Sequence, residues 1–320
     1  MELNNKLYHN NTMSLRISYI LPGTRLSNSD LVKLFPEWTE EKILKKTGIA
    51  SRHVADEGEG TLELAEVACR NLFAAEKIAP STVDFILFCT QSPKYRLPST
   101  ACLLQQRIGI PTTAGALDYD LGCSGFVYGL ALAKGLIVGG MAKNVLLVTS
   151  ETYTKHLGEM DKSTRSIFGD GAAVTLVDRQ LAERIGQFSF GTDGSGAEKL
   201  IMRDGERLFM DGPEIFNFTL DVVPKTINDI CVKNGLMREQ VDFYVFHQAN
   251  KFMLDTIRKV NGLPKDRFYV DLEDIGNTVS STIPIALKRA QDNGKLLPGM
   301  KVMLMGFGVG LSWGGTILQY

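Results

Sequence analysis

The chain has 320 residues, 44% of them hydrophobic and 22% charged, which is the composition of a globular protein with one large or two ordinary domains. With 35 basic and 36 acidic residues the net charge is −1, so no charge bias favours nucleic acid or a membrane surface as a partner. Five cysteines form no C-x-x-C pair, which argues against a disulfide scaffold and a zinc site and favours a reducing compartment. We therefore expect a cytoplasmic protein without a bound metal.

The N-terminal residues 1–12 are polar and rich in asparagine, and they contain no apolar segment of the kind found in signal peptides. We expect them to form a disordered tail. No apolar run in the rest of the chain approaches the length of a membrane-spanning helix.

The first half of the chain alternates short strands and helices. Turn signals such as Pro22-Gly23 and capping residues such as Ser27 mark the ends of these elements. In chain order, we predict a strand at 14–19, short helices ending near 35 and 46, a longer helix capped by Thr61, a buried strand at 83–89, a helix at 99–108, a strand ending at 120, a helix from about 126, and strands at 144–149 and 169–177.

The second half repeats this order with weak sequence identities. The strand at 83–88 recurs at 241–246, the strand at 144–148 recurs at 301–305, and the strand at 169–177 recurs at 310–318. The segment around residue 123, a strand followed by a turn and a helix, also has a counterpart. It consists of the run at 268–271, the turn that follows it and a helix at 281–290. We therefore predict two similar α/β halves packed as layers, covering residues 13–182 and 183–320.

One cysteine lies at a predicted strand-to-helix turn. The strand ending at 120 is followed by the small-residue turn Gly122-Cys123-Ser124-Gly125 and then by an apolar run with helical spacing. Unpaired N–H groups and the positive end of the helix dipole favour thiolate over thiol at such a place. Cys123 is therefore a candidate nucleophile, and the alternative is a buried, unreactive cysteine.

Two further polar residues lie at equivalent turns. His247 directly follows the buried strand at 241–246, and Asn277 occupies the second-half counterpart of the Cys123 turn. Binding sites in α/β folds collect at strand ends, so both residues join Cys123 as candidates. The alternatives are a core histidine and an ordinary turn asparagine.

The glycine-rich run Gly306-Phe307-Gly308-Val309-Gly310 follows a predicted strand. It lacks the lysine of a P-loop and the first-turn context of a dinucleotide fingerprint. We interpret it as a loop whose backbone approaches another group closely.

Taken together, these motifs resemble the beta-ketoacyl-ACP synthase III family of the thiolase superfamily over nearly the whole chain. They are Thr47-Gly48-Ile49, Gly122-Cys123-Ser124-Gly125, Ile167-Phe168-Gly169-Asp170-Gly171-Ala172, His247-Gln248-Ala249-Asn250, Gly276-Asn277-Thr278, and Gly306-Phe307-Gly308 with Ser312-Trp313-Gly314. Thiolases combine Cys and His with a second Cys, and elongating synthases use Cys-His-His. A Cys-His-Asn set in a chain this short resembles the initiating type.

The resemblance implies a thiolase-like fold with αβαβα layers and a decarboxylating condensation without metal or other cofactor. Cys123 would take an acyl group from acyl-CoA or acyl-ACP. His247 and Asn277 would then stabilise the enolate formed from malonyl-ACP, and the backbone N–H groups of Cys123 and Val309 would form an oxyanion hole. Ping-pong kinetics follow from the acyl-enzyme.

The resemblance also implies roles at the pocket and the surface. A partner subunit of a homodimer would place Leu97 in the acyl pocket, where many members have phenylalanine, so longer or branched acyl groups would fit. The residues expected at the acyl pocket or its gate are Leu97 and Phe307, and those expected to contact CoA or the acidic acyl carrier protein are Trp38, Phe216, Asn250, Lys251, Arg258 and Lys259.

The chain departs from the family pattern at several of these positions. Trp38 lies further upstream than the tryptophan that stacks on the CoA adenine, and Pro213 and Asn217 replace family contact residues. Phe252 stands at a familiar arginine position, so the basic residues after His247 form either a carrier-protein patch or an ordinary solvated face.

Two other functions remain open at this point. The same acyl-enzyme would transfer its acyl group to a hydroxyl, an amine or water in an acyltransferase without decarboxylation. A non-catalytic partner of another synthase is the third possibility, against which the complete Cys-His-Asn set argues.

Overall fold

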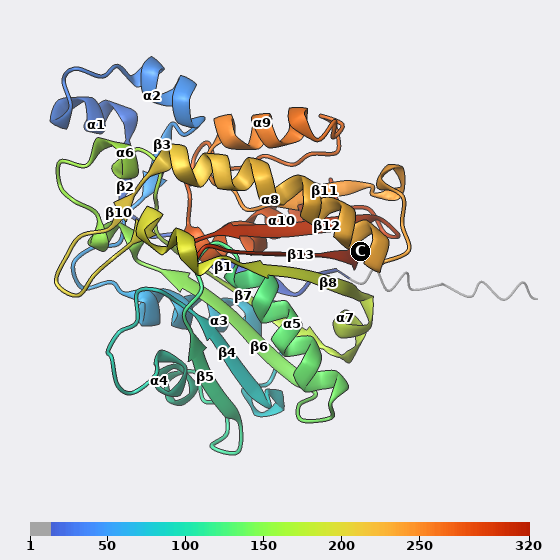
Figure 1. Ribbon diagram of the computed structural model, residues 1–320. Helices are drawn as coiled ribbons and strands as arrows, with labels where there is room; N and C mark the ends of the chain where they lie inside the picture. Colours follow the sequence, from blue (N-terminus) through green and yellow to red (C-terminus); the bar gives the residue numbers. More distant parts are fainter. Residues whose placement is uncertain (1–13) are drawn as a thin grey trace, which may run out of the picture.

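The computed structural model describes residues 14–320, and the tail predicted at 1–12 lies outside the described residues. Two β-sheets alternate with three layers of helices (Figure 1). Helices α3 and α4 cover the outer face of the first sheet, α5 and α10 lie between the sheets, and α8 covers the second sheet with α9 beside it. This is the αβαβα arrangement that the sequence predicted.

The helices predicted in the first half and at 281–290 begin and end close to the predicted positions, whereas α6, α7 and α8 were not predicted. The bounds of the helices are α1 (Asn28–Leu34), α2 (Glu40–Thr47), α3 (Thr61–Glu76), α4 (Thr100–Arg107), α5 (Gly125–Val138), α6 (Lys162–Arg165), α7 (Arg179–Arg184), α8 (Gly212–Lys233), α9 (Lys251–Val260) and α10 (Thr282–Asp292). Helix α1 begins with a capping box between Ser27 and Asp30. Thr61 is not the N-cap of α3 as predicted, because Gly60 takes that place and the Thr61 hydroxyl donates instead to the Ser92 carbonyl at 2.7 Å.

The first sheet has the order β1-β7-β6-β4-β5, and the second has the order β11-β12-β13-β8. The strands are β1 (Ile17–Ile20), β4 (Phe85–Cys89), β5 (Gly115–Tyr119), β6 (Asn144–Glu151), β7 (Gly171–Asp178), β8 (Ile185–Thr192), β11 (Phe243–Phe246), β12 (Lys301–Gly308) and β13 (Ser312–Gln319). Two small ribbons pair β2 (Arg25–Ser27) with β3 (Ser51–His53) and β9 (Leu200–Ile201) with β10 (Phe209–Met210).

The two sheets share one pairing scheme. Strand β4 runs parallel to β6, and β6 runs antiparallel to β7; in the same way β11 is parallel to β12 and β12 antiparallel to β13. Phe85 lies opposite Val145 in the first sheet, as Phe243 lies opposite Val302 in the second. A single bridge from Tyr244 to Phe268 takes the place of β5. The boundary predicted between residues 182 and 183 falls inside α7, which joins β7 to β8.

The longest helix, α8, is absent from the sequence-based elements. Gly212 and Pro213 resemble a turn, and Pro224 interrupts the helical pattern. In the structure Asp211 caps the helix, and Pro213 falls within the first turn, where its missing N–H costs nothing. The apolar face of α8 then packs on β8 and β13.

This architecture gathers several strand ends at one edge. Strands β4, β5 and β6 are mutually parallel, as are β11 and β12, so their carboxyl ends each meet on one side of a sheet. Cys123 follows β5, His247 follows β11, and Gly308 ends β12. The candidate residues from the two halves therefore converge between the sheets.

Candidate active site

The Cys123 turn is held tightly against the second half of the molecule. The Gly125 N–H donates to the Gly122 carbonyl at 2.8 Å, and α5 begins at once. A Cβ atom placed on Gly308 would lie 2.9 Å from the Cys123 Cβ and 3.2 Å from its Sγ, and one on Gly306 would lie 2.6 Å from the Cys123 carbonyl oxygen. The glycine-rich run is therefore a close-approach backbone, as predicted, and what it approaches is the nucleophile's turn.

The resting state of Cys123 differs from the sequence-based expectation. Its side chain is buried, with 8% of the residue exposed. Burial raises the pKa of the Cys123 thiol, and the nearby Glu151 raises it further, while the Cys123 backbone N–H acts in the opposite direction. Loss of solvation therefore opposes the ionisation expected at a helix terminus and favours the thiol over the thiolate.

His247 is buried and neutral. Burial lowers its pKa to about 3, because no carboxylate compensates for the lost solvation of the charged ring. Its Nδ1 lies 2.7 Å from the Thr282 hydroxyl, which also lies 3.0 Å from the Val279 carbonyl. The one hydroxyl hydrogen of Thr282 can go to either acceptor, and when it goes to Nδ1 the ring carries its own proton on Nε2.

Asn277 is fixed by the turn that follows it. Its side-chain oxygen accepts from the Val279 N–H at 2.9 Å, which leaves the Nδ2 amide group 3.5 Å from His247 Nε2. Val279 adopts φ of 54°, a left-handed conformation that a β-branched residue rarely takes. Such strain is found where the surrounding structure holds a functional residue in place.

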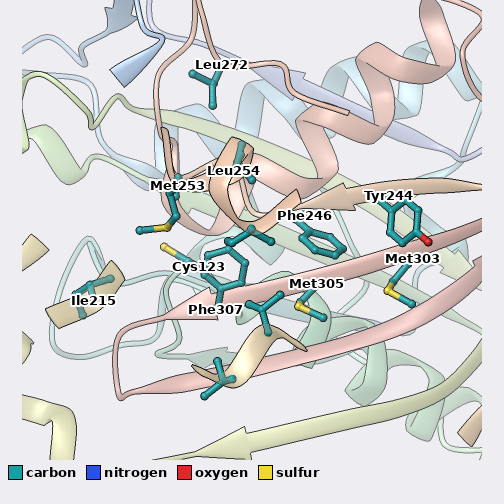
Figure 2. Packing of buried hydrophobic residues seen from close by; sticks show 14 of the residues in the cluster. Cys123, Ile215, Tyr244, Phe246, Met253, Leu254, Leu272, Met303, Met305 and Phe307 are labelled. Atoms are coloured by element: carbon teal, nitrogen blue, oxygen red, sulfur yellow. The ribbon is translucent and has the colours of Figure 1, made fainter. Parts of the chain in front are cut away.

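Cys123, His247 and Asn277 line one cavity of about 90 Å³. The rest of its wall is mostly apolar and comes from Ile167, Phe168, Leu200, Met210, Gly212, Ile215, Ala249, Asn250, Met253, Phe307 and Gly308. Figure 2 shows Cys123 with Ile215, Met253 and Phe307 around it. The three predicted residues therefore meet in one buried, apolar place.

Phe307, Val309 and Leu97, which were also predicted near Cys123, differ in their position relative to its cavity. Phe307 lies with its ring edge against His247, the ring centres being 5.6 Å apart, so it belongs to the catalytic cavity rather than to a separate gate. Val309 follows Gly308 and lines a second cavity. Leu97 is 87% exposed in the single chain and contributes to neither cavity.

Trp38 lies among three lysines. The ammonium groups of Lys42 and Lys46 lie 5.8 Å from its ring centre, and that of Lys162 lies 5.7 Å away. Phe216 stacks on Phe252, with ring centres 5.4 Å apart. An aromatic ring within a ring of cations is suited to a flat group that carries phosphates.

The residues predicted at the start of α9 separate into two groups. Asn250 lines the catalytic cavity and caps α9 by accepting from the Met253 N–H at 2.8 Å. Lys251, which pairs with Asp255, and Lys259 lie around a shallow surface hollow between α2 and α9. Arg258 is half-buried and donates to the Leu263 carbonyl at 3.3 Å, so it lies apart from that hollow.

Sequence reasoning missed Glu151, Ser280 and Thr282. Glu151 ends β6, is fully buried and accepts hydrogen bonds from the Gln91 N–H, the Ser92 hydroxyl and the Ser280 hydroxyl at 3.0–3.2 Å. Burial raises its pKa to about 8. The available signal was an acidic residue at the end of a strand that is otherwise apolar.

Residues 14–320 contain neither a metal-binding cluster nor a membrane-spanning helix. No group of three or more His, Cys, Asp or Glu side chains is arranged to hold a metal ion. None of the helices in this part of the chain is long and apolar enough to cross a bilayer.

Comparisons with known proteins agree over most of the chain. Residues 117–194 match the family described as 3-oxoacyl-[acyl-carrier-protein] synthase III, and residues 231–320 match its C-terminal region. The beta-ketoacyl-[acyl-carrier-protein] synthase III of Neisseria gonorrhoeae is 34% identical over 310 residues, which cover 94% of this chain and 96% of that protein.

Solved structures give the same result. One 3-oxoacyl-(acyl-carrier-protein) synthase III is 46% identical with a TM-score of 0.92, and the match covers 96% of this chain and 99% of the other. The Thermus thermophilus beta-ketoacyl-ACP synthase III is 34% identical with a TM-score of 0.88, covering 95% and 98%.

Proposed function

The chain belongs to the 3-oxoacyl-ACP synthase III family, which has a thiolase-like fold, and we propose that it condenses a Cys123-bound acyl group with malonyl-ACP to give 3-oxoacyl-ACP. The observation that carries this proposal is the meeting of Cys123, His247 and Asn277 in one buried cavity. Each residue comes from a different turn, and the wall of the cavity is mostly apolar.

Acylation is the first half-reaction. The Cys123 sulfur attacks the thioester carbonyl of acyl-CoA or acyl-ACP, the carbonyl–sulfur bond of the donor breaks, and the donor leaves as a thiol. Because the resting nucleophile is a thiol, its proton must leave as the new bond forms. The neutral imidazole of His247 lines the same cavity; with its own proton on Nδ1, which then donates to the Thr282 hydroxyl, its free Nε2 takes this proton and passes it to the leaving thiolate, and the Nε2–H tautomer forms before the second half-reaction.

Condensation is the second half-reaction. Malonyl-ACP loses carbon dioxide, and the electron pair of the broken bond forms an enolate whose oxygen accepts hydrogen bonds from His247 Nε2–H and Asn277 Nδ2–H. The enolate carbon then attacks the acyl carbonyl, the bond from that carbonyl to the Cys123 sulfur breaks, and the released thiolate takes up one proton from the solvent to restore the thiol. Neutral donors in an apolar cavity stabilise the enolate strongly because water does not screen them.

The remaining expectations fit this scheme. The backbone N–H groups of Cys123 and Val309 form the oxyanion hole, since Gly308 lies directly against the Cys123 side chain. The two half-reactions give ping-pong kinetics, and every step uses groups of this chain and its substrates, without a cofactor.

The surface offers a place for the donor and the carrier. Trp38 with Lys42, Lys46 and Lys162 suits the adenine and phosphates of CoA. The hollow lined by Lys45, Lys251 and Lys259 suits an acidic acyl carrier protein.

The active form is a homodimer. Strand β5 is the edge of the five-stranded sheet, and an unpaired edge is a template for a second copy. Tyr95 and Leu97 are 53% and 87% exposed in the single chain, which is costly for large apolar side chains unless a partner covers them. In the dimer, Leu97 of one protomer reaches the acyl pocket of the other.

Intact-protein mass spectrometry tests the proposal. The protein and its Cys123→Ala variant are incubated with acyl-CoAs and acyl-ACPs from acetyl to octanoyl, and malonyl-ACP is then added while carbon dioxide is measured. We expect a mass gain only in the unaltered protein, followed by equal amounts of carbon dioxide and 3-oxoacyl-ACP. An adduct that moves to a hydroxyl or amine without carbon dioxide would make the protein an acyltransferase, and a chain inert toward every donor would contradict both.

A further inference from the structure

A second and larger cavity adjoins the catalytic one. Its volume is about 290 Å³, Leu200 lines both cavities, and the neighbouring residues Gly308 and Val309 line one each. The wall consists of Gln91, Asp120, Tyr153, Ala197, Leu200, Ile201, Met202, Leu208, Val309 and Gly310. The position beside the Cys123 turn makes this cavity the place for the acyl group once Cys123 is acylated.

The polar part of this wall stands out against the apolar wall of the first cavity. The Tyr153 hydroxyl donates to Gln91 Oε1 at 3.4 Å, a long and weak hydrogen bond. Within residues 14–320, the Gln91 amide nitrogen and the Asp120 carboxylate have no hydrogen-bond or ion-pair partner. Three side chains with free hydrogen-bonding capacity therefore line one space next to the nucleophile.

Gln91 and Tyr153 are held in place by their surroundings, whereas Asp120 lies at the exposed side of the cavity. The Gln91 N–H donates to both oxygens of Glu151, at 3.2 and 3.0 Å, which fixes the backbone at this point. A Cβ atom on Gly122 would lie 2.7 Å from Gln91 Oε1, so the Gln91 side chain packs directly on the Cys123 turn. Tyr153 is buried and packs on Phe168, with ring centres 5.0 Å apart.

The electrostatic character of the cavity favours a donor on the ligand. Asp120 supplies a carboxylate, which only accepts hydrogen bonds, and Gln91 supplies an amide oxygen whose only partner is the distant Tyr153 hydroxyl. Burial, together with Cys123, Glu151 and Asp120, raises the pKa of Tyr153 well above its usual range, so the phenol remains protonated. An alkyl group in this space would cover the Gln91 amide and the Tyr153 hydroxyl without offering them a hydrogen-bond partner, whereas Asp120 at the exposed side keeps its contact with water.

Building on the proposed acyl-enzyme, we propose that Gln91, Asp120 and Tyr153 select acyl groups that carry a hydrogen-bond donor, a hydroxyl or an ammonium group, over plain alkyl groups of the same size. A site built to bond such a group discriminates more strongly against an analogue that lacks it than an apolar pocket does against one that adds it. The selection acts in the first half-reaction, before malonyl-ACP binds.

Three acyl groups with the same number of non-hydrogen atoms make the test. Butyryl, 3-hydroxypropionyl and β-alanyl groups are each presented on CoA and on acyl carrier protein, in pairwise competition, and the Cys123 adducts are quantified by intact mass. We expect the hydroxyl or the ammonium donor to load at least about tenfold faster than butyryl. Tyr153→Phe and Gln91→Leu should each bring this ratio close to one.

A matched control and one further variant complete the design. Tyr128→Phe removes a hydroxyl that lies near the carbonyls of Gly191 and Trp313, outside the cavity, and should leave the ratio unchanged. Asp120→Asn should reduce β-alanyl loading much more than 3-hydroxypropionyl loading, which separates an ammonium from a hydroxyl specificity.

The two proposals fail in different ways. Equal or faster loading of butyryl, with a ratio that Tyr153→Phe and Gln91→Leu leave unchanged, would overturn the selection for donors and leave the acyl-enzyme intact. A complete absence of adducts from all donors, in a protein that is folded and dimeric, would overturn the acyl-enzyme itself and this inference with it.

Discussion

The duplicated halves place two clusters of side chains at equivalent positions, and one of the clusters lines the cavity that contains Cys123, His247 and Asn277. Counterparts follow from the shared strand registers and from the starts of α5 and α10: Cys89 matches His247, Glu151 matches Gly308, and Ser280 matches Cys123. Cys89, Glu151 and Ser280 form the second cluster, which is fully buried.

The two clusters differ in which side chain lies at the carboxyl end of two equivalent strands, β12 in the second half and β6 in the first. At the end of β12, Gly308 has no side chain, so the Cys123 side chain packs directly against it, and both residues line the cavity that also contains His247. At the end of β6, the Glu151 side chain occupies the equivalent space and accepts a hydrogen bond from Ser280 at 3.0 Å. The comparison teaches that a missing side chain is as necessary to this site as the nucleophile.

Asn277→Asp should have the largest effect on the catalytic cluster. The change replaces an amide donor by a carboxylate facing the enolate oxygen, and we expect condensation to fall about 100- to 1000-fold. Acylation of Cys123 should persist, because Asn277 acts only in the second half-reaction. Carbon dioxide release measured on the preformed acyl-enzyme checks this, with Asn293→Asp at the far end of α10 as the control. Undiminished carbon dioxide release would rule out the enolate role.

Gly308→Ala adds a small side chain at the position where the equivalent residue of the first half, Glu151, has a large one. The added Cβ would lie 2.9 Å from the Cys123 Cβ, so either β12 or the Cys123 turn must move. Displacements near 1 Å at reacting atoms cost about 100-fold, and we expect a loss of that order in the acylation rate. Gly135→Ala, on α5 with open space around it, is the matched control. Normal acylation of the Gly308 variant would show that the space is dispensable.

Glu151→Gln tests the protonation state of Glu151 through the pH dependence of the unfolding free energy. The folded-state pKa of Glu151 is raised to about 8, above its value in the unfolded chain, so the unfolded state releases the proton first as the pH rises. The Glu151 contribution to stability therefore declines between these two pKa values and is constant above the folded one. Between pH 6 and pH 7.5 the decline is about 2 kcal/mol, and the variant should not show it.

Denaturant unfolding of the unaltered protein and the variant at several pH values gives this difference directly. A difference in unfolding free energy that is the same at pH 6 and pH 7.5 would mean that Glu151 is ionised in the folded protein. The amide keeps an oxygen that accepts from Ser280, so the fold should survive.

Cys89→Ala should have the smallest effect. Cys89 is fully buried and its thiol donates to the Leu121 carbonyl at 2.7 Å, so we expect a loss of about 1 kcal/mol in unfolding free energy. Acylation should be unchanged, because Cys89 is not among the residues that line the cavity of Cys123 and His247. A large loss of acylation with normal stability would show that the two clusters are coupled.

Much of this arrangement was predictable because its signals are local. The small residues around Cys123, the apolar run before His247 and the turn at Asn277 each carry a short-range pattern, and the order of strands repeats visibly. The parts that were missed depend on distant contacts. Glu151 looks like any polar strand end until the fold brings Ser280 beside it, and the resting thiol follows from burial rather than from the helix terminus.

The neutral, covered thiol of Cys123 also affects how the protein meets oxidants. Peroxides attack thiolates that are open to solvent, and Cys123 in its resting state is neither ionised nor open. In the proposed mechanism, Cys123 loses its proton only while a thioester is in place beside His247, which confines its reactivity to the time of turnover. A cell under oxidative stress would therefore retain this activity longer than that of enzymes with a preformed thiolate.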